Sequence, residues 1–195
     1  RAGARLLMED VSFRIAAGDK VGLVGRNGAG KTTMTRILAG EGEPAGGSVH
    51  SSGSVGYLPQ DPRTGDPEML ARDRILGARG LDDVVRRLRE AEVEMASSDP
   101  ATHERGMKRW ARADAELHAG GGYAVEAEAA QMAAALGIEE RILAQPLKTL
   151  SGGQRRRVEL ARILFSDAEV LLLDEPTNHL DADSIVWLRD FLKSY

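Results

Sequence analysis

The sequence predicts an α/β protein in which a core of parallel strands and helices is interrupted by an all-helical insert. Two short apolar runs, residues 20–24 and 170–173, are typical of strands buried in a parallel sheet. Between them, from about residue 68 to residue 144, the chain is rich in Ala, Glu and Arg, and its apolar residues follow helical spacing. The length of 195 residues is enough for one domain with a full core.

The composition excludes several classes of protein. Apolar residues make up 42% and charged residues 29%, a globular balance that argues against disorder. The net charge of −4 excludes a strongly basic nucleic-acid coat, although a local basic patch remains compatible with it. Without cysteine there is no disulfide scaffold, no thiol catalysis and no Cys-ligated zinc. No apolar stretch approaches the roughly 20 residues that cross a bilayer, and no signal peptide opens the chain, so we expect a cytoplasmic protein.

The first sixty residues are predicted to form strands around one helix. Residues 11–15 alternate apolar and polar side chains, and residues 20–24 lead into a glycine-rich loop. Helical spacing follows after Lys31 and ends near Gly40. Residues 46–58 are rich in Gly, Ser and Val, which predicts short antiparallel strands around a turn at Ser52 and Gly53.

The remainder is predicted to be mostly helical. Three amphipathic helices are expected at about residues 81–95, 107–117 and 125–136, with a break at the glycines 120–122. Trp110 lies at helical spacing and is expected to pack. Ser151 opens another helix, residues 170–173 form a buried strand, and residues 184–192 form the last helix.

The segment from Gly25 to Thr32 fits the phosphate-loop pattern of glycine, four residues, glycine, lysine and a hydroxyl residue. Its glycines let backbone N–H groups turn toward phosphate oxygens, and the helix that follows adds a favourable dipole. Lys31 would neutralise the β- and γ-phosphates, and the Thr32 hydroxyl would ligate Mg²⁺. The alternative is a flexible surface turn.

Two carboxylates, Asp174 and Glu175, follow the strand at residues 170–173. The carboxyl end of a strand is where an α/β sheet binds its ligand. Asp174 is therefore expected to hold Mg²⁺, directly or through water, and Glu175 to polarise the attacking water as a general base. Acidic residues often follow strands, so this motif alone is a weak signal. Together with the phosphate loop it becomes a strong one.

A serine and two glycines open the helix that starts after Leu150, which makes a second backbone anion site. A single bound nucleotide does not need two anion sites within one domain. The second site therefore predicts a composite nucleotide site that another domain completes. The alternative is a capped helix start with a flexible lead-in.

Taken in order, these motifs resemble the ATP-binding cassette (ABC) ATPases. The resemblance implies an α/β P-loop NTPase core of the ABC type, with a small antiparallel β subdomain and an inserted α-helical subdomain. It divides the chain into residues 1–60, residues 61–149 with a candidate arm, and residues 150–195. The matching motifs are Walker A at Gly25 to Thr32, the Q-loop at Gln60, the signature at Leu150 to Gln154, Walker B at Asp174 and Glu175, and the D-loop at Leu180 and Asp181.

Within that family the chain most resembles the ABC-F branch, whose members join two cassettes in one chain without a membrane domain. Residues 56–62, 151–164 and 175–181 are typical of it, whereas transporter cassettes more often differ at Asn178 and His179. The resemblance implies an ATPase that acts on the ribosome, as a translation factor or an antibiotic ribosome-protection protein. The alternatives are the nucleotide-binding subunit of an ABC transporter and an isolated nucleotide-binding module.

The resemblance also implies roles for individual residues. Glu175, Gln60 and Lys31 would be catalytic, and Thr32, Gln60 and Asp174 would hold Mg²⁺. Ser151, Gly153 and Gln154 would contact ATP bound to a second cassette, which Asp181 would also contact. ATP on this cassette would be held by Gly25, Arg26, Asn27, Gly28, Ala29, Gly30, Lys31, Thr32 and Thr33.

Two departures from the family pattern predict that the chain is a fragment of one cassette. The family's switch histidine lies beyond Tyr195, and its adenine-stacking aromatic lies before Arg1; Phe13 is expected in the core instead. The implied partners are a second cassette, in the same full-length chain or as a homodimer of the fragment, and the ribosome and its RNA through a missing linker. No membrane subunit is expected, and His50, His103 and His118 lack the spacing of a zinc site.

Overall fold

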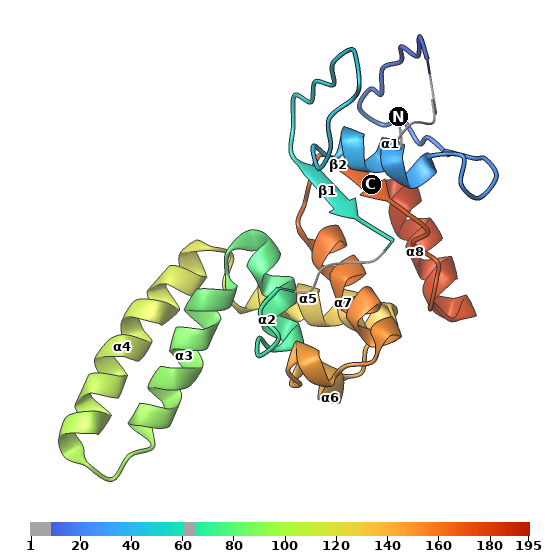
Figure 1. Cartoon of the computed structure of the whole chain (residues 1–195). Helices are drawn as coiled ribbons and strands as arrows, with labels where there is room; N and C mark the ends of the chain where they lie inside the picture. The colour runs from blue at the N-terminus through green and yellow to red at the C-terminus, as the bar shows by residue number, and fades with distance from the viewer. Residues whose placement is uncertain (1–8, 61–64) are drawn as a thin grey trace.

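The protein is seen in a computed structural model that describes residues 9–60 and 65–195. A two-stranded parallel sheet lies beside a group of helices, and a helical hairpin projects away from both (Figure 1). In the described ranges, no helix is long and apolar enough to span a membrane. The elements in chain order are α1 (Lys31–Leu38), β1 (Val55–Leu58), α2 (Ala71–Leu76), the 3₁₀ turn η1 (Gly77–Arg79), α3 (Asp82–Met95), α4 (Pro100–Ala119), α5 (Tyr123–Ala135), α6 (Glu140–Leu143), the 3₁₀ turn η2 (Leu147–Thr149), α7 (Gly152–Phe165), β2 (Val170–Leu173) and α8 (Ala182–Ser194).

The sheet joins two segments that are far apart in the sequence. β1 and β2 pair in parallel, from Val55 opposite Val170 to Leu58 opposite Leu173. Helix α7 packs closely on β1 at Gly56, where a Cβ atom would lie 3.1 Å from the Ile163 side chain. The parallel pairing confirms the predicted α/β class and brings the carboxyl ends of both strands to one edge.

The apolar core lies mainly among the helices. Its fully buried large side chains include Ile75 of α2 together with Leu160 and Phe165 of α7. A buried carboxylate ties α2 to α7: Glu159 accepts hydrogen bonds from Arg74 Nε at 2.5 Å and from Arg162 Nε at 2.9 Å. The insert is therefore fastened to the helix that the signature motif opens.

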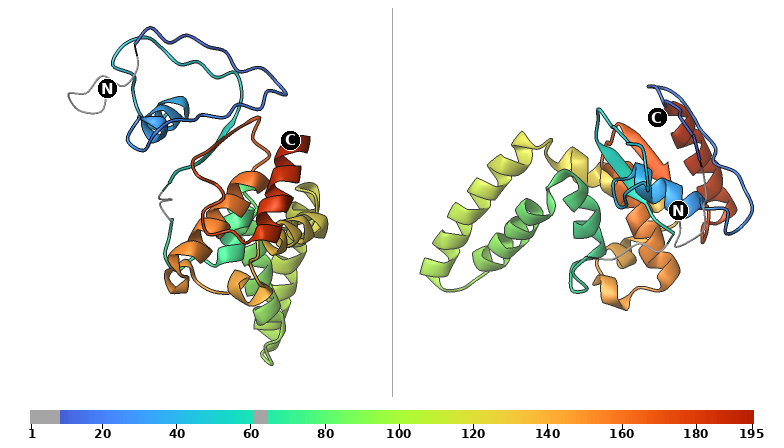
Figure 2. Two further views of the ribbon diagram at one scale, coloured as in Figure 1. Left: turned by 90° about the vertical axis from the view of Figure 1, so that its right-hand side faces the viewer. Right: turned by 45° about the horizontal axis from the view of Figure 1, so that its top comes forward.

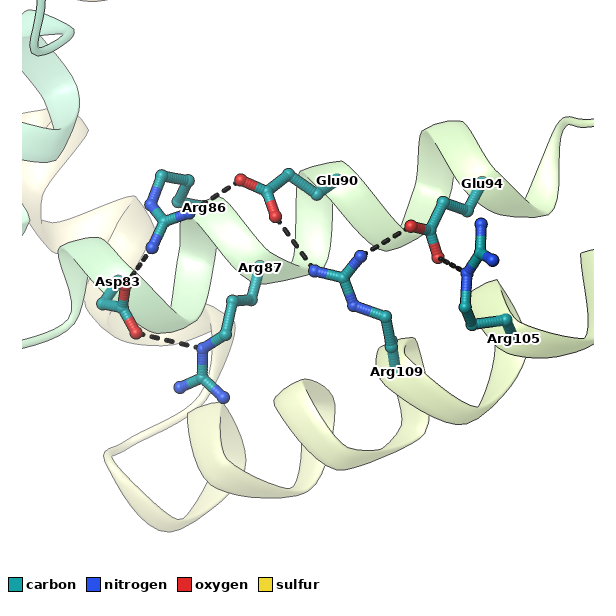
Figure 3. A network of polar contacts seen from close by, with 7 residues as sticks. All are labelled: Asp83, Arg86, Arg87, Glu90, Glu94, Arg105 and Arg109. Carbon is teal, nitrogen blue, oxygen red and sulfur yellow. Dashed lines mark hydrogen bonds and ion pairs between the residues drawn. The ribbon is translucent and has the colours of Figure 1, made fainter. Parts of the chain in front are cut away.

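The projecting hairpin consists of α3 and α4, which lie antiparallel and away from the sheet in both views (Figures 1 and 2). Ion pairs cross between the helices, including Arg109 to Glu90 at 3.0 Å and Arg109 to Glu94 at 2.6 Å (Figure 3). Exposed ion pairs contribute little to stability, so the apolar seam between the helices carries most of it. Trp110 packs against the core partly buried, as its spacing predicts.

The predicted helices are confirmed, but the N-terminal strands are not. Residues 11–15 and 20–24 form no strand, Val24 is 90% exposed, and Phe13, expected in the core, is 52% exposed. Within the described residues only β1 and β2 pair, so these two segments have no neighbouring strand to satisfy their backbone groups. The phosphate-loop motif is therefore followed by the predicted helix but not preceded by the predicted strand.

The predicted antiparallel strands at residues 46–58 are also wrong. Only residues 55–58 become a strand, and that strand pairs in parallel with β2. Ser54 starts this pairing, because its carbonyl accepts from Val170 N at 3.0 Å and its hydroxyl from Glu169 N at 3.1 Å. β2 itself is half-buried, not buried, since few elements cover it.

Gly106 sets how closely α3 and α4 approach. A Cβ atom there would lie 2.7 Å from Met95 N. We expect Gly106→Val to destabilise the protein by about 1–3 kcal/mol through overpacking, measured by urea unfolding followed by circular dichroism. Ala111→Val, on the exposed side of the same helix, should cost only a few tenths of a kcal/mol through helix propensity. Equal losses for the two variants would contradict a tight helix contact at Gly106.

Candidate functional site

The glycine-rich loop before α1 presents backbone groups to solvent. Gly28 and Gly30 have φ values of 78° and 95°, a region that glycine adopts without a steric penalty. Gly30 caps α1 without a side-chain hydrogen bond, so the first-turn N–H groups are not capped by a side chain. The Lys31 ammonium donates to the carbonyls of Gly25 at 2.8 Å and Arg26 at 3.2 Å. Such a loop can bind an anion with its N–H groups and its lysine.

Asp174 is the most buried acidic group at the sheet edge. It is 7% exposed, and its amide donates to the Leu58 carbonyl at 3.0 Å, which extends the β1–β2 ladder by one residue. Its Oδ2 atom is buried and has no hydrogen-bond partner among the described residues. An unpaired buried carboxylate oxygen is costly unless a cation or a donor meets it.

This carboxylate suits a hard cation. Mg²⁺ is held in proteins by one or two carboxylates together with phosphates and water. Asp174, with the predicted ligands Thr32 and Gln60, supplies a set of this kind. In the part of the chain that the structure describes, no three His, Cys, Asp or Glu side chains gather into a metal cluster.

Glu175 lies in a strained turn directly after Asp174. Its φ is 50°, unusual for a residue other than glycine, and its side chain is exposed. Its Oε2 atom accepts a hydrogen bond from Asn178 Nδ2 at 2.8 Å, and Asn178 N donates to its carbonyl at 3.2 Å. Asn178 therefore orients the carboxylate that the sequence predicts to be the general base.

The signature motif forms the capped start of α7. Ser151 Oγ accepts from Gln154 N at 3.2 Å, and Gln154 Oε1 accepts from Ser151 N at 2.8 Å, a reciprocal capping box. A Cβ atom at Gly153 would lie 3.5 Å from His179 Cβ, so the motif adjoins the turn that carries Glu175. The Gln154 side chain is thus engaged within its own helix.

Hydrogen bonds and burial shift the pKa values of two groups near the site, Asp181 and Tyr57. Asp181 caps α8, and the Ser184 N–H that it accepts at 2.8 Å lowers its pKa, with a smaller effect from Arg157. Burial raises the pKa of Tyr57 on β1, and the negative charge of Asp174 raises it further. The Tyr57 hydroxyl therefore lies within electrostatic reach of the Asp174 carboxylate.

The structure brings Gln60, Asp174 and Glu175 together through Arg156, whose guanidinium binds the backbone carbonyls of all three. The run of three arginines at residues 155–157 predicts a solvated helix face, with contact to RNA or a partner as the alternative. For Arg156, which is 5% exposed, the solvated face is wrong. The helical period could have predicted this burial. Arg156 lies four residues before the buried Leu160 and therefore on the same face of the helix. α1, which carries Lys31 and Thr32, contacts β2.

Comparison with known proteins assigns the chain to a family. Residues 8–178 match the family described as ABC transporter. The chain is 36% identical over 194 residues to the energy-dependent translational throttle protein EttA of Haemophilus influenzae, covering 98% of this chain and 34% of that protein. It is 38% identical over 197 residues to the tylosin resistance ATP-binding protein TlrC of Streptomyces fradiae, covering 98% and 35%. The chain thus spans about a third of the length of these relatives.

A solved structure has a similar fold. The dimeric ATP-binding cassette MJ0796, bound to ADP and phosphate in a post-hydrolysis state, superposes with a TM-score of 0.61 at 22% identity, covering 96% of this chain and 74% of that one. This likeness supports the P-loop NTPase fold expected from the motifs.

The capping box predicts a stability effect at the site. We expect Ser151→Ala to lower the free energy of unfolding by about 1 kcal/mol, because Gln154 N loses its acceptor. Urea unfolding measures the loss. Ser166→Ala at the other end of α7 should cost less, since the Ile163 carbonyl keeps its backbone donor. A larger loss at Ser166 would contradict the capping role of Ser151.

Proposed function

Since this chain belongs to the ABC transporter family and is an ABC ATP-binding domain, we propose that it is one cassette of a longer ABC-F protein that hydrolyses ATP in the cytoplasm and acts on the ribosome. The observation that carries the nucleotide site is the buried Oδ2 atom of Asp174, which has no hydrogen-bond partner among the described residues. Arg156 links the backbone of Asp174 to that of Gln60 and Glu175. The relatives named for translational throttling and tylosin resistance support the ribosomal role.

In this proposal the phosphates of ATP lie on the loop from Gly25 to Thr33. The Lys31 ammonium exchanges its two loop carbonyls for phosphate oxygens. Mg²⁺, held by Thr32, Gln60 and Asp174, would neutralise phosphate charge. Glu175, oriented by Asn178, accepts a proton from the attacking water.

The second half of the composite site comes from another cassette. Ser151, Gly153 and Gln154 lie at the start of a helix where Ser151 and Gly152 are exposed and Gly153 and Gln154 half-buried, so its N-terminus would be available to a phosphate on the partner. The partner is a second cassette of the same longer chain or, for this chain alone, a second copy. The ribosome would be reached through the linker that joins two cassettes.

A second candidate function is the nucleotide-binding subunit of an ABC transporter. The family match carries that description, and the site chemistry is the same for both functions. Co-purification of the longer protein with a membrane subunit would favour it.

Glu175→Gln should separate binding from turnover. In the longer protein we expect ATP hydrolysis to fall by about 10²- to 10⁴-fold, because a carboxamide cannot accept the proton of water. ATP affinity should be retained. Phosphate release and equilibrium binding of labelled ATP measure the two effects. Glu169→Gln, an exposed carboxylate before β2, is the control and should leave turnover unchanged.

Ribosome pelleting tests the proposed partner. The longer protein with Glu175→Gln and the matching change in its second cassette should sediment with 70S particles only when ATP is present, because it closes on ATP without hydrolysing it. Adding Lys31→Ala should abolish sedimentation by removing the phosphate-binding ammonium. Displacement of a bound drug would then separate a resistance protein from a translation factor. If the trapped protein stays in the supernatant at low salt, the ribosomal role fails and a membrane partner becomes the leading candidate.

A further inference from the structure

Arg156 lies on α7, two residues after the signature motif, and its guanidinium reaches the edge of the sheet. Nη1 donates to the carbonyls of Pro59, at 3.0 Å, and Gln60. Nη2 donates to the carbonyls of Asp174, at 2.6 Å, and Glu175, at 3.0 Å. One side chain therefore holds the two segments that leave the carboxyl ends of β1 and β2.

The position of these bonds is informative. The β1–β2 ladder ends with Asp174 N donating to the Leu58 carbonyl, and beyond it no backbone hydrogen bond joins the two segments among the described residues. Arg156 continues the connection with its own donors. A buried guanidinium is costly unless its N–H groups are satisfied. Here four carbonyls accept from Nη1 and Nη2, whereas Nε is buried without a partner among the described residues.

We propose that Arg156 is a positioning residue that fixes the separation between Gln60 and Asp174, and so the geometry with which their side chains meet one Mg²⁺ ion. The inference rests on the proposed function, since it concerns the Mg²⁺–ATP site. Arg156 touches neither nucleotide nor metal in this role. It acts through the backbone of the two ligand residues, in the way that groups outside the ligand set tune other metal sites.

The test measures ATP affinity of the purified chain by equilibrium binding, once with Mg²⁺ and once with EDTA. In Arg156→Gln we expect affinity with Mg²⁺ to fall by about 10- to 100-fold, as for other residues that support metal ligands, while affinity with EDTA is unchanged. Arg156→Lys keeps the charge but offers a compact ammonium with three donors, so it should show a smaller loss. Arg155→Gln is the matched control: Arg155 binds only the Leu150 carbonyl beside its own helix, and both affinities should match the parent.

Hydrogen exchange supplies a readout that needs no nucleotide. Peptides covering residues 55–60 and 172–178 should both exchange faster in Arg156→Gln and Arg156→Lys, while peptides from α3 and α4 exchange as in the parent. Equal losses of affinity with Mg²⁺ and with EDTA, or unchanged exchange in either sheet-edge peptide, would overturn the inference. If the parent binds ATP no better with Mg²⁺ than with EDTA, the proposed function fails, and the exchange result still decides whether Arg156 couples the two segments.

Discussion

The parallel pairing of β1 with β2 is the constraint on which the site depends. Each strand has only four residues, yet their register places Pro59 and Gln60 opposite Asp174 and Glu175. A parallel pair needs a long crossover, and here that crossover includes the whole insert. The pairing therefore holds only if the insert folds back against α7. The buried contact of Arg74 with Glu159 and the close packing at Gly56 supply that closure from the helical side.

Helix α7 carries two buried charged residues, Glu159 and Arg156, which have different partners and different roles. The negative charge of Glu159 is neutralised by the positive charges of Arg74 and Arg162, and the pair with Arg74 fastens the insert to α7. Arg156 meets only carbonyls among its hydrogen-bond partners, so its charge is balanced by dipoles at the sheet edge. Removing one partner of a buried pair leaves an uncompensated charge, which is why such contacts resist rearrangement. The same helix thus joins the insert, the signature motif and the two predicted Mg²⁺-binding segments.

The helices could be predicted from the sequence because their signals are local. Ser151 with Gln154 and the glycines at 120–122 each act within one turn of chain, and the structure uses both. Strand pairing is not local. Residues 20–24 carry the apolar pattern of a strand but remain unpaired, whereas residues 55–58 pair because Ser54 meets Glu169 and Val170 more than a hundred positions away. The burial of Arg156 was not predicted for a related reason. Arg156 is the middle one of three consecutive arginines, and only the helical period decides which of them faces the core.

Two of the side chains that would meet ATP already have partners inside the cassette. The Lys31 ammonium is bound to two loop carbonyls, and the Gln154 side chain closes the cap of its own helix. At these two side chains nucleotide binding would exchange one hydrogen-bond partner for another, so other groups must supply part of the favourable free energy. The uncapped start of α1 and the buried Oδ2 atom of Asp174 are such groups. The latter can be satisfied only by a cation or a donor, so a bound metal would contribute to binding in addition to the lysine contact, and the arginine proposed to position its ligands would support that contribution.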